Sequence, residues 1–341
     1  MARLIISASA FVLFATVFRK HAGNQHIIRA VTIASFLHIF LSVADLTSHA
    51  IGFPEALSYI RTSAANMLDN QIMLGIKRMS GGFPEPSSYS YYTIGLYAFW
   101  LTYWFRSKSS KGGGIMAIVM ALLLIRSTST SAFVCLGTFT ALFFSAHFAS
   151  IARNRHAFLT YLTIGFVTPI CIAAFVLAYN FVPALQSLLD HILFDKASSA
   201  SGVERMSWNT QALKNFYETY GLGTGIGSVR SSSWLTSTLG SMGIIGLGLF
   251  LWFIVQCFLT KSAPKDRNTQ TTILAIALQN GAAGVFLQSL ITKPYPNLEV
   301  PFFAMLGIAI GLLGYQARQS VAGAPAPTVY PRAALLSAHP K

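Results

Sequence analysis

The side chains with the clearest chemical potential are arginines that interrupt apolar or glycine-rich segments. Arg126 stands in LLLIRSTSTSAF between two apolar runs. A cation at such a position is costly, which indicates a functional site, although its long side chain could also reach lipid phosphates or an acid. Three more arginines lie in polar segments: Arg78, Arg205 and Arg230. Because a charged side chain in such surroundings needs an opposite charge, these arginines call for a charge partner, which could be an acid, a lipid phosphate or an anionic ligand.

Two carboxylates lie near these arginines in the sequence. Glu85 lies between two prolines in FPEP, and Glu204 directly precedes Arg205. Glu204 also completes Ser201-Gly202-Val203-Glu204, which is typical of a helix capping box with Ser201 as the N-cap. Arg205 would then lie in the first turn of a helix, where a cation opposes the macrodipole, unless an anionic ligand or Glu218 offsets it. Lys77 is expected to be a solvated neighbour of the site.

A glycine run follows the predicted helix, in GLGTGIGS at residues 221–228. Gly223, Gly225 and Gly227 could expose backbone N–H groups that cradle a phosphate. A flexible turn is the simpler interpretation, since the run follows a helix and lacks the Gly-Lys-Ser/Thr of a phosphate loop. No spacing of His, Cys, Asp or Glu is typical of a metal site, so we expect neither a metal ion nor a cofactor.

The elements that position these residues are predicted to be membrane-spanning helices. Of the 341 residues, 53% are hydrophobic and 10% are charged, against about 25% charged residues in a soluble domain. A bilayer core needs about 20 apolar residues as a helix. Nine segments meet this pattern: 3–18, 28–46, 89–105, 113–126, 131–151, 157–180, 234–260, 271–292 and 298–316. The sequence therefore predicts an all-α polytopic membrane protein with one transmembrane domain, residues 1–316.

The charges of the connecting segments predict the orientation. The net charge is +14, and nearly all of it falls on one of two alternating sets of connections. The positive set is expected to be cytoplasmic, which places the amino terminus outside and the carboxyl terminus inside. Two long, near-neutral loops, about 47–88 and 184–233, then lie outside and contain amphipathic helices. Residues 317–341 are expected to form a disordered cytoplasmic tail. The basic pI reflects this topology rather than nucleic-acid binding.

Four segments, in this order, resemble the bacterial O-antigen ligase and polysaccharide polymerase superfamily. They are RMSGGFPEPSSYSYY (78–92), RSTSTSAFVCLG (126–137), SGVERMSWNTQAL (201–213) and GLGTGIGSVRSSSWLTSTLGSMGIIG (221–246). The resemblance covers most of the chain from residue 60 to 315. Family members usually have ten or more spans with both termini cytoplasmic, and the ligases carry a catalytic His after the glycine-rich stretch. Here Val229-Arg230-Ser231-Ser232-Ser233 follows instead, which favours the exopolysaccharide polymerases.

The resemblance implies a metal-independent glycosyltransferase in the bacterial inner membrane. Its substrate would be an undecaprenyl-diphosphate-linked oligosaccharide, polymerised at the periplasmic face into an exopolysaccharide or O-antigen. The arginines would stabilise the diphosphate, Glu85 or Glu204 would take a proton, and Trp208, Tyr217 and Tyr220 would face the sugars. Membrane lipids, a chain-length regulator and export proteins are the implied partners.

Three alternative functions remain open at this point. An O-antigen ligase would transfer the glycan to lipid A core with the same diphosphate chemistry. A lipid-linked oligosaccharide flippase or other transporter should show repeats and polar residues at mid-bilayer, whereas charges here gather in the outer loops. A non-catalytic subunit of an export complex is the third alternative.

Overall fold

The computed structural model describes residues 2–53, 56–61, 72–73, 76–107, 111–152, 199–261 and 269–322. In this part of the chain the main elements are helices. They are α1 (Ala2–Lys20), α2 (Asn24–Ala50), α3 (Pro86–Arg106), α4 (Lys111–Arg126), α5 (Thr130–Ala152), α8 (Ala200–Glu218), α9 (Trp234–Leu259), α10 (Gln270–Thr292) and α11 (Glu299–Ala322). Two antiparallel two-residue strands, β1 (Ile72–Met73) and β2 (Ile76–Lys77), are the described β-structure.

Six described helices are long and apolar enough to cross a membrane, namely α1, α2, α5, α9, α10 and α11. This confirms an all-α membrane protein. The predicted spans 89–105 and 113–126 are also helical, but α4 has 16 residues and α3 is rich in Tyr, Ser and Thr. The predicted span 157–180 lies outside the described residues, so the count of nine stays a prediction. Residues 317–322 continue α11, where the sequence predicts a disordered tail.

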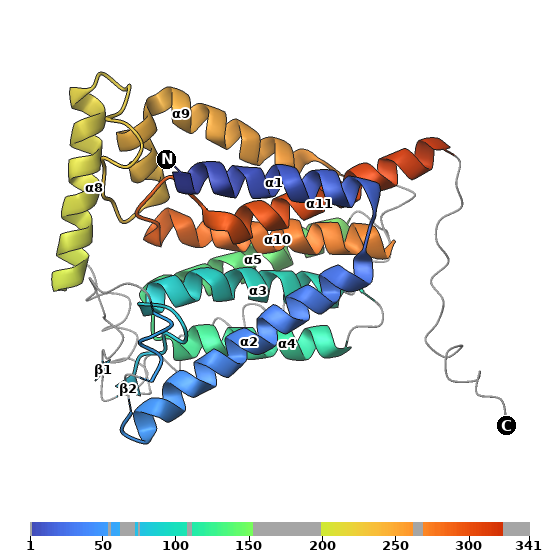
Figure 1. Cartoon of the computed structure of the whole chain (residues 1–341), viewed down its shortest axis with the longest axis horizontal. Coiled ribbons are helices and arrows are strands. Elements are labelled where there is room, and N and C mark those ends of the chain that lie inside the picture. Colours follow the sequence, from blue (N-terminus) through green and yellow to red (C-terminus); the bar gives the residue numbers. More distant parts are fainter. Residues whose placement is uncertain are drawn as a thin grey trace.

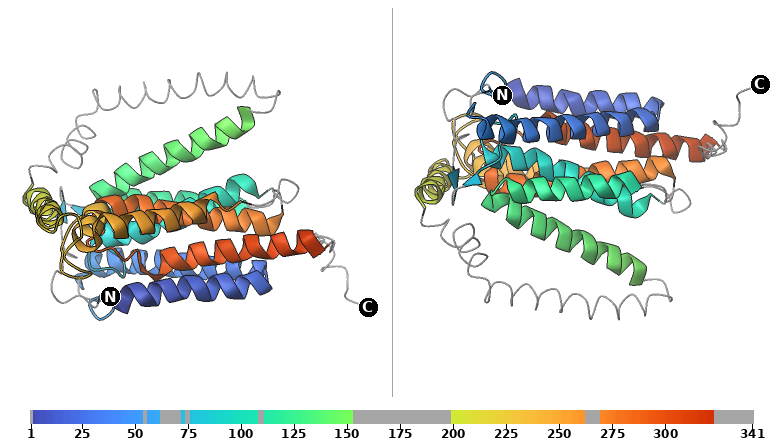
Figure 2. Two further views of the ribbon diagram at one scale, coloured as in Figure 1. Left: turned by 90° about the horizontal axis from the view of Figure 1, so that it is seen from above. Right: turned by 90° about the horizontal axis from the view of Figure 1, so that it is seen from below.

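The core of the bundle is built around α3, which packs against α10 and α4, while α10 packs against α11 and α11 against α1. Small residues allow these close approaches. A Cβ on Gly95 of α3 would lie 2.6 Å from the Val285 side chain, and one on Gly307 of α11 would lie 2.5 Å from the Phe11 carbonyl oxygen. In contrast, α5 diverges from the bundle along its length (Figure 2).

The connections gather at two opposite ends of the bundle (Figure 1). One end, which we call the loop end, holds the start of α1, the described residues between α2 and α3 (51–53, 56–61, 72–73 and 76–85), the α4–α5 turn, α8 with residues 219–233, and the α10–α11 connection. The ends of α1, α3 and α9 lie at the other. The two predicted sets of connections stay a prediction. Which end faces the cytoplasm stays a prediction.

Helix α8 lies across the loop end, nearly perpendicular to the bundle, and packs against α9 (Figure 1). Its N-cap is Ser199, whose Oγ accepts from the Gly202 N–H at 3.2 Å. The predicted capping box with Ser201 as N-cap is therefore wrong, because the helix begins two residues earlier and Gly202, not Glu204, occupies the N3 position.

The glycine run packs against a break in α9. Gly243 has φ 67° and ψ −171°, so the helical hydrogen-bond pattern is interrupted there. The Thr224 and Gly225 N–H groups donate to the carbonyls of Gly240 and Ser241, both at 2.9 Å. A Cβ on Gly243 would lie 2.3 Å from the Gly221 carbonyl oxygen, so only glycine fits this crossing.

Candidate functional site

Arg205 pairs with Glu85 at the loop end, and both are close enough to Arg78 to influence its charge. Arg205 Nη2 lies 3.8 Å from Glu85 Oε2, and each side chain is about one third exposed (32% and 31%). Burial, and then the positive charge of Arg205, lowers the pKa of Arg78, while the negative charge of Glu85 opposes that shift. Two guanidinium groups therefore share the surroundings of one carboxylate. We call Arg78, Glu85 and Arg205 the arginine site.

Glu85 is positioned by the start of α3. It occupies the N-cap position with an extended backbone (φ −151°), and Pro86 begins the helix, a place where the missing N–H of proline costs nothing. The Glu85 carboxylate makes no capping bond to the backbone. Instead its Oε1 accepts from the Ser87 hydroxyl at 2.5 Å and from the Ser88 hydroxyl at 3.3 Å. These bonds fix the carboxylate that faces Arg205.

The segment that carries Arg78 is held by a buried ionic cluster, which the sequence did not predict. Asp45 Oδ1 accepts from Arg61 Nη2 at 2.6 Å and from Lys77 Nζ at 2.7 Å. Asp45 Oδ2 accepts from the backbone N–H groups of Ser80 and Gly81, both at 2.9 Å. The Asp45 and Arg61 side chains are fully buried and that of Lys77 nearly so. The expectation that Lys77 is solvated is therefore wrong, because it pairs with Asp45 instead.

Arg126, at the end of α4, contacts the same segment. Its Nη1 donates to the backbone carbonyl of Lys77 at 2.7 Å, one residue before Arg78. The half-buried side chain therefore lies next to the arginine site. This contact gives Arg126 a role in positioning Arg78, beside the catalytic role that the sequence suggests.

Helix α8 is fixed to the start of α9 by Asn209, one turn after Arg205. Its Oδ1 accepts from the Ser231 hydroxyl at 2.7 Å and from the Ser232 N–H at 2.9 Å. The neighbouring Arg230 lies over the Trp208 ring, with its guanidinium carbon 3.9 Å from the ring centroid. This cation–π contact uses the Trp208 face that was expected to meet a sugar.

The other predicted site residues lie at the surface or in the turn. Tyr217 and Tyr220 are 72% and 96% exposed. Glu204 is exposed as well, and within the described part of the chain its carboxylate forms no hydrogen bond or ion pair with Arg78, Glu85 or Arg205. These positions leave Glu85 as the better placed of the two predicted acids.

The glycines of the run adopt the left-handed backbone that the turn requires. Gly223, Gly225 and Gly227 have φ of +81°, +101° and +99°. The N–H of Gly223 donates to Thr219 Oγ1, and that of Gly225 donates to the Ser241 carbonyl, both at 2.9 Å. Because these two donors are already used within the chain, their geometry favours a structural turn over a phosphate cradle.

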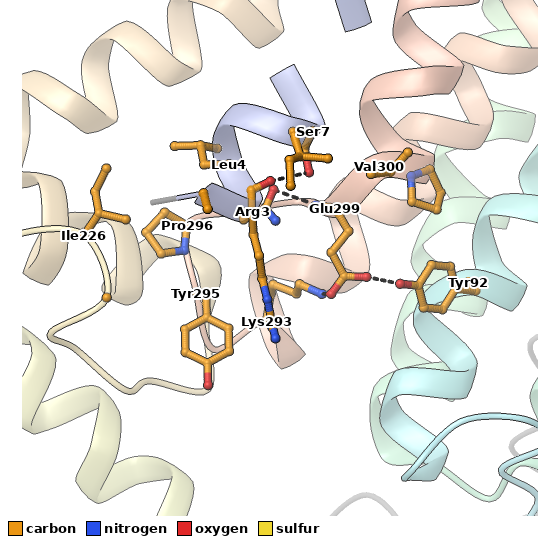
Figure 3. A pocket seen from close by; sticks show the side chains of 15 residues that line it. Arg3, Leu4, Ser7, Tyr92, Ile226, Lys293, Tyr295, Pro296, Glu299 and Val300 are labelled. Atoms are coloured by element: carbon orange, nitrogen blue, oxygen red, sulfur yellow. Dashed lines mark hydrogen bonds and ion pairs between the residues drawn. The ribbon is translucent and has the colours of Figure 1, made fainter. Parts of the chain in front are cut away.

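A cavity of about 610 Å³ lies at the same end, between the start of α1, α3 and the α10–α11 connection. Glu299 forms an ion pair with Lys293 and accepts a hydrogen bond from the Tyr92 hydroxyl (Figure 3). Burial, and then the charge of Arg3, lowers the pKa of Lys293 to about 7, while Glu85 opposes this shift. Glu85 therefore influences both the cavity and the arginine site.

Sequence reasoning missed this cavity because its walls come from segments far apart in the chain, around residues 2–7, 92, 226–227 and 293–301. Lys293 and Glu299 flank Pro-Tyr-Pro-Asn-Leu, a short connection with one cation and one acid, and that pairing was the available signal. Within the described ranges, no group of three or more His, Cys, Asp and Glu side chains could hold a metal ion. Comparison of the chain with protein-family models and with curated proteins finds no match.

Proposed function

We propose that this chain is a membrane glycosyltransferase that polymerises oligosaccharide repeat units carried on undecaprenyl diphosphate. The observation that carries the proposal is the convergence of Arg78 and Arg205 around Glu85 at one end of a bundle of apolar helices. A lipid-linked diphosphate has an anionic group at the membrane surface and a chain within the bilayer. The arginine site complements the anionic group, and the apolar helices complement the lipid chain.

The proposed reaction joins two sugars without a change of oxidation state. A hydroxyl oxygen of the acceptor sugar attacks the anomeric carbon of the donor and gives its proton to a carboxylate, and the bond from that carbon to the diphosphate oxygen breaks. The electron pair of this bond passes to the diphosphate, where charge builds up. Arg78 and Arg205 would stabilise it, because guanidinium groups bind phosphate oxygens in pairs. Removing one such contact should cost about 3 kcal/mol, or roughly a hundredfold in rate.

The experiment uses the purified full chain in liposomes with lipid-linked repeat units as the sole substrate. The expected product is a ladder of longer glycans, formed in the presence of a metal chelator. Arg205→Ala should lower the rate about a hundredfold, and Arg205→Lys should restore little of it, because lysine cannot form the paired contact. Lys214→Ala is the matched control, since Lys214 lies on α8 but pairs with the exposed Glu218.

Three outcomes would overturn the proposal. Arg205→Ala at the wild-type rate, with equal protein in the membrane, would remove Arg205 from the reaction. Transfer to lipid A core without a ladder would identify a ligase. Movement of lipid-linked units across the bilayer without any new glycosidic bond would identify a transporter.

A further inference from the structure

The cavity beside the arginine site has walls suited to a sugar. Tyr92, Tyr295, Asn297 and Glu299 supply aromatic, amide and carboxylate groups, and Ile226 is among its apolar lining residues (Figure 3). Aromatic faces with a few fixed polar groups are typical of sites for small polar ligands. The volume of about 610 Å³ lies within the range of such sites.

Glu299 is held in the cavity by an unusual backbone conformation. Its φ is +64°, in the left-handed region that residues other than glycine rarely adopt. The Glu299 N–H donates to Asn297 Oδ1 at 3.1 Å, which helps to maintain this conformation at the start of α11. Strained backbone of this kind tends to occur at functional sites. Of the described non-glycine residues with positive φ, Glu299 alone lines the cavity.

The Glu299 carboxylate retains capacity for a ligand. Lys293 Nζ donates to its Oε1, and the Tyr92 hydroxyl donates to its Oε2. An ionised carboxylate can accept about four hydrogen bonds. The two described partners therefore orient the group and leave each oxygen able to accept one more hydrogen bond, such as that of a sugar hydroxyl.

Helix α3 links the cavity to the arginine site. Glu85 at its N-cap and Tyr92 are seven residues apart, so they lie on the same face two turns apart, about 10 Å along the axis. Phe83 stacks on Tyr92 with ring centroids 4.7 Å apart, beside the start of the helix. A diphosphate at the arginine site and a sugar in the cavity would thus be neighbours along one helix.

We infer that this cavity binds the acceptor sugar and that Glu299 accepts the proton of its attacking hydroxyl group. The inference rests on the proposed glycosyl transfer. As the hydroxyl oxygen forms its bond to the anomeric carbon, its proton passes to a Glu299 oxygen, and the diphosphate leaves with the electron pair of the broken bond. The proton is then released to water. Arg78 and Arg205 act on the leaving group, and Glu299 acts on the acceptor.

The test compares Glu299→Gln with Glu218→Gln, which changes an exposed acid at the same end of the molecule. The neutral amide fits the same space but cannot take the proton, so Glu299→Gln should lower kcat at least a hundredfold. Binding of a fluorescent undecaprenyl-diphosphate oligosaccharide should stay within twofold of wild type, because the arginine site is intact. Glu218→Gln should retain the wild-type rate and binding.

Two further variants separate catalysis from folding. Glu299→Asp keeps a carboxylate and should recover part of the lost kcat. Tyr92→Phe removes one oriented hydrogen bond and should lower kcat severalfold with KM for the acceptor little changed. Thermal unfolding in detergent identifies any variant that fails to fold. If Glu299→Gln is unfolded, a wild-type kcat in both Glu299→Asp and Tyr92→Phe overturns the inference.

The outcomes distinguish this inference from the proposed function. A folded Glu299→Gln protein with more than half of the wild-type kcat would refute the role of Glu299, while the ladder from the wild-type protein would leave the glycosyltransferase proposal intact. Absence of any ladder from the wild-type protein would instead refute both.

Discussion

Neutralising Asp45 should destabilise the loop end more than any other single charge change outside the candidate site. Asp45 Oδ1 faces Arg61 and Lys77, and Oδ2 faces the N–H groups of Ser80 and Gly81. In Asp45→Asn one oxygen becomes an amide NH₂, which in either orientation faces two donors. The variant also removes the carboxylate charge that the buried side chains of Arg61 and Lys77 share. Breaking a buried ion pair in this way costs about 3–5 kcal/mol.

The assay is thermal unfolding of the purified protein in detergent, with glycan synthesis measured in parallel. A loss of this size should lower Tm by about 10 °C. Activity should fall too, because Lys77 and Ser80 flank Arg78 closely. The control Glu218→Gln removes an exposed pair with Lys214, at 60% and 63% exposure, and should cost no more than about 0.5 kcal/mol.

A second variant tests the physical reason. Adding Lys77→Met to Asp45→Asn removes one of the two buried cations that Asp45 contacts and should recover part of the lost Tm. If Asp45→Asn unfolds at the same temperature as Glu218→Gln, the buried cluster does not stabilise the loop end and the reasoning fails.

Three further predictions address topology, the glycine crossing and pH. A reporter fused after Lys111 should be cytoplasmic and one after Ser199 external, and the reverse result would place the site on the wrong side of the membrane. Gly243→Ala should cost more than about 2 kcal/mol in thermal unfolding, because φ is positive and the added Cβ meets backbone; an unchanged Tm would contradict this. Below its pKa of about 7, Lys293 is positively charged, and this charge weakens the neighbouring Glu299 carboxylate as a base. Log kcat should therefore rise between pH 6 and 8. Lys293→Met should abolish this inflection, and an unchanged profile would exclude Lys293 as its cause.

The groups that face the Lys293 ammonium come from each of the surrounding elements. Arg3 of α1 repels its positive charge, and Glu85 at the start of α3 stabilises it. Glu299 of α11 forms the ion pair, and the ammonium lies 4.4 Å from the centroid of the Tyr91 ring. Because burial is the largest cause of the lowered pKa, a variant that opens the cavity to water should move the inflection to higher pH.

Hydropathy predicts the helices well because a membrane span requires an unbroken apolar run, a property of local sequence. The same local logic failed at the start of α8, where Ser199 and Ser201 both fit an N-cap and only the neighbouring chain decides between them. It also misjudged Lys77, because its partner Asp45 lies on α2, a different element from the short strand β2 that carries Lys77.

The site shows the same division between local and distant information. Arg78, Glu85 and Arg205 could be selected as uncommon charges beside glycine, proline or a helix start, yet their meeting depends on how α8 crosses the bundle. The cavity was not predictable in this way. Tyr92 and Glu299 look ordinary in sequence and become informative only when α3 and α11 place them together.

The close packing of α1 on α11 has a consequence for how the protein is made. Phe11 on α1 meets Gly307 on α11 so closely that neither helix can complete its packing without the other. A ribosome adds about 5–20 residues per second, so ~300 residues of synthesis leave α1 without this partner for about 15–60 s. During that interval α1 must be accommodated by lipid or by the insertion machinery. Docking of α11 is therefore expected to be among the last steps of assembly at the membrane.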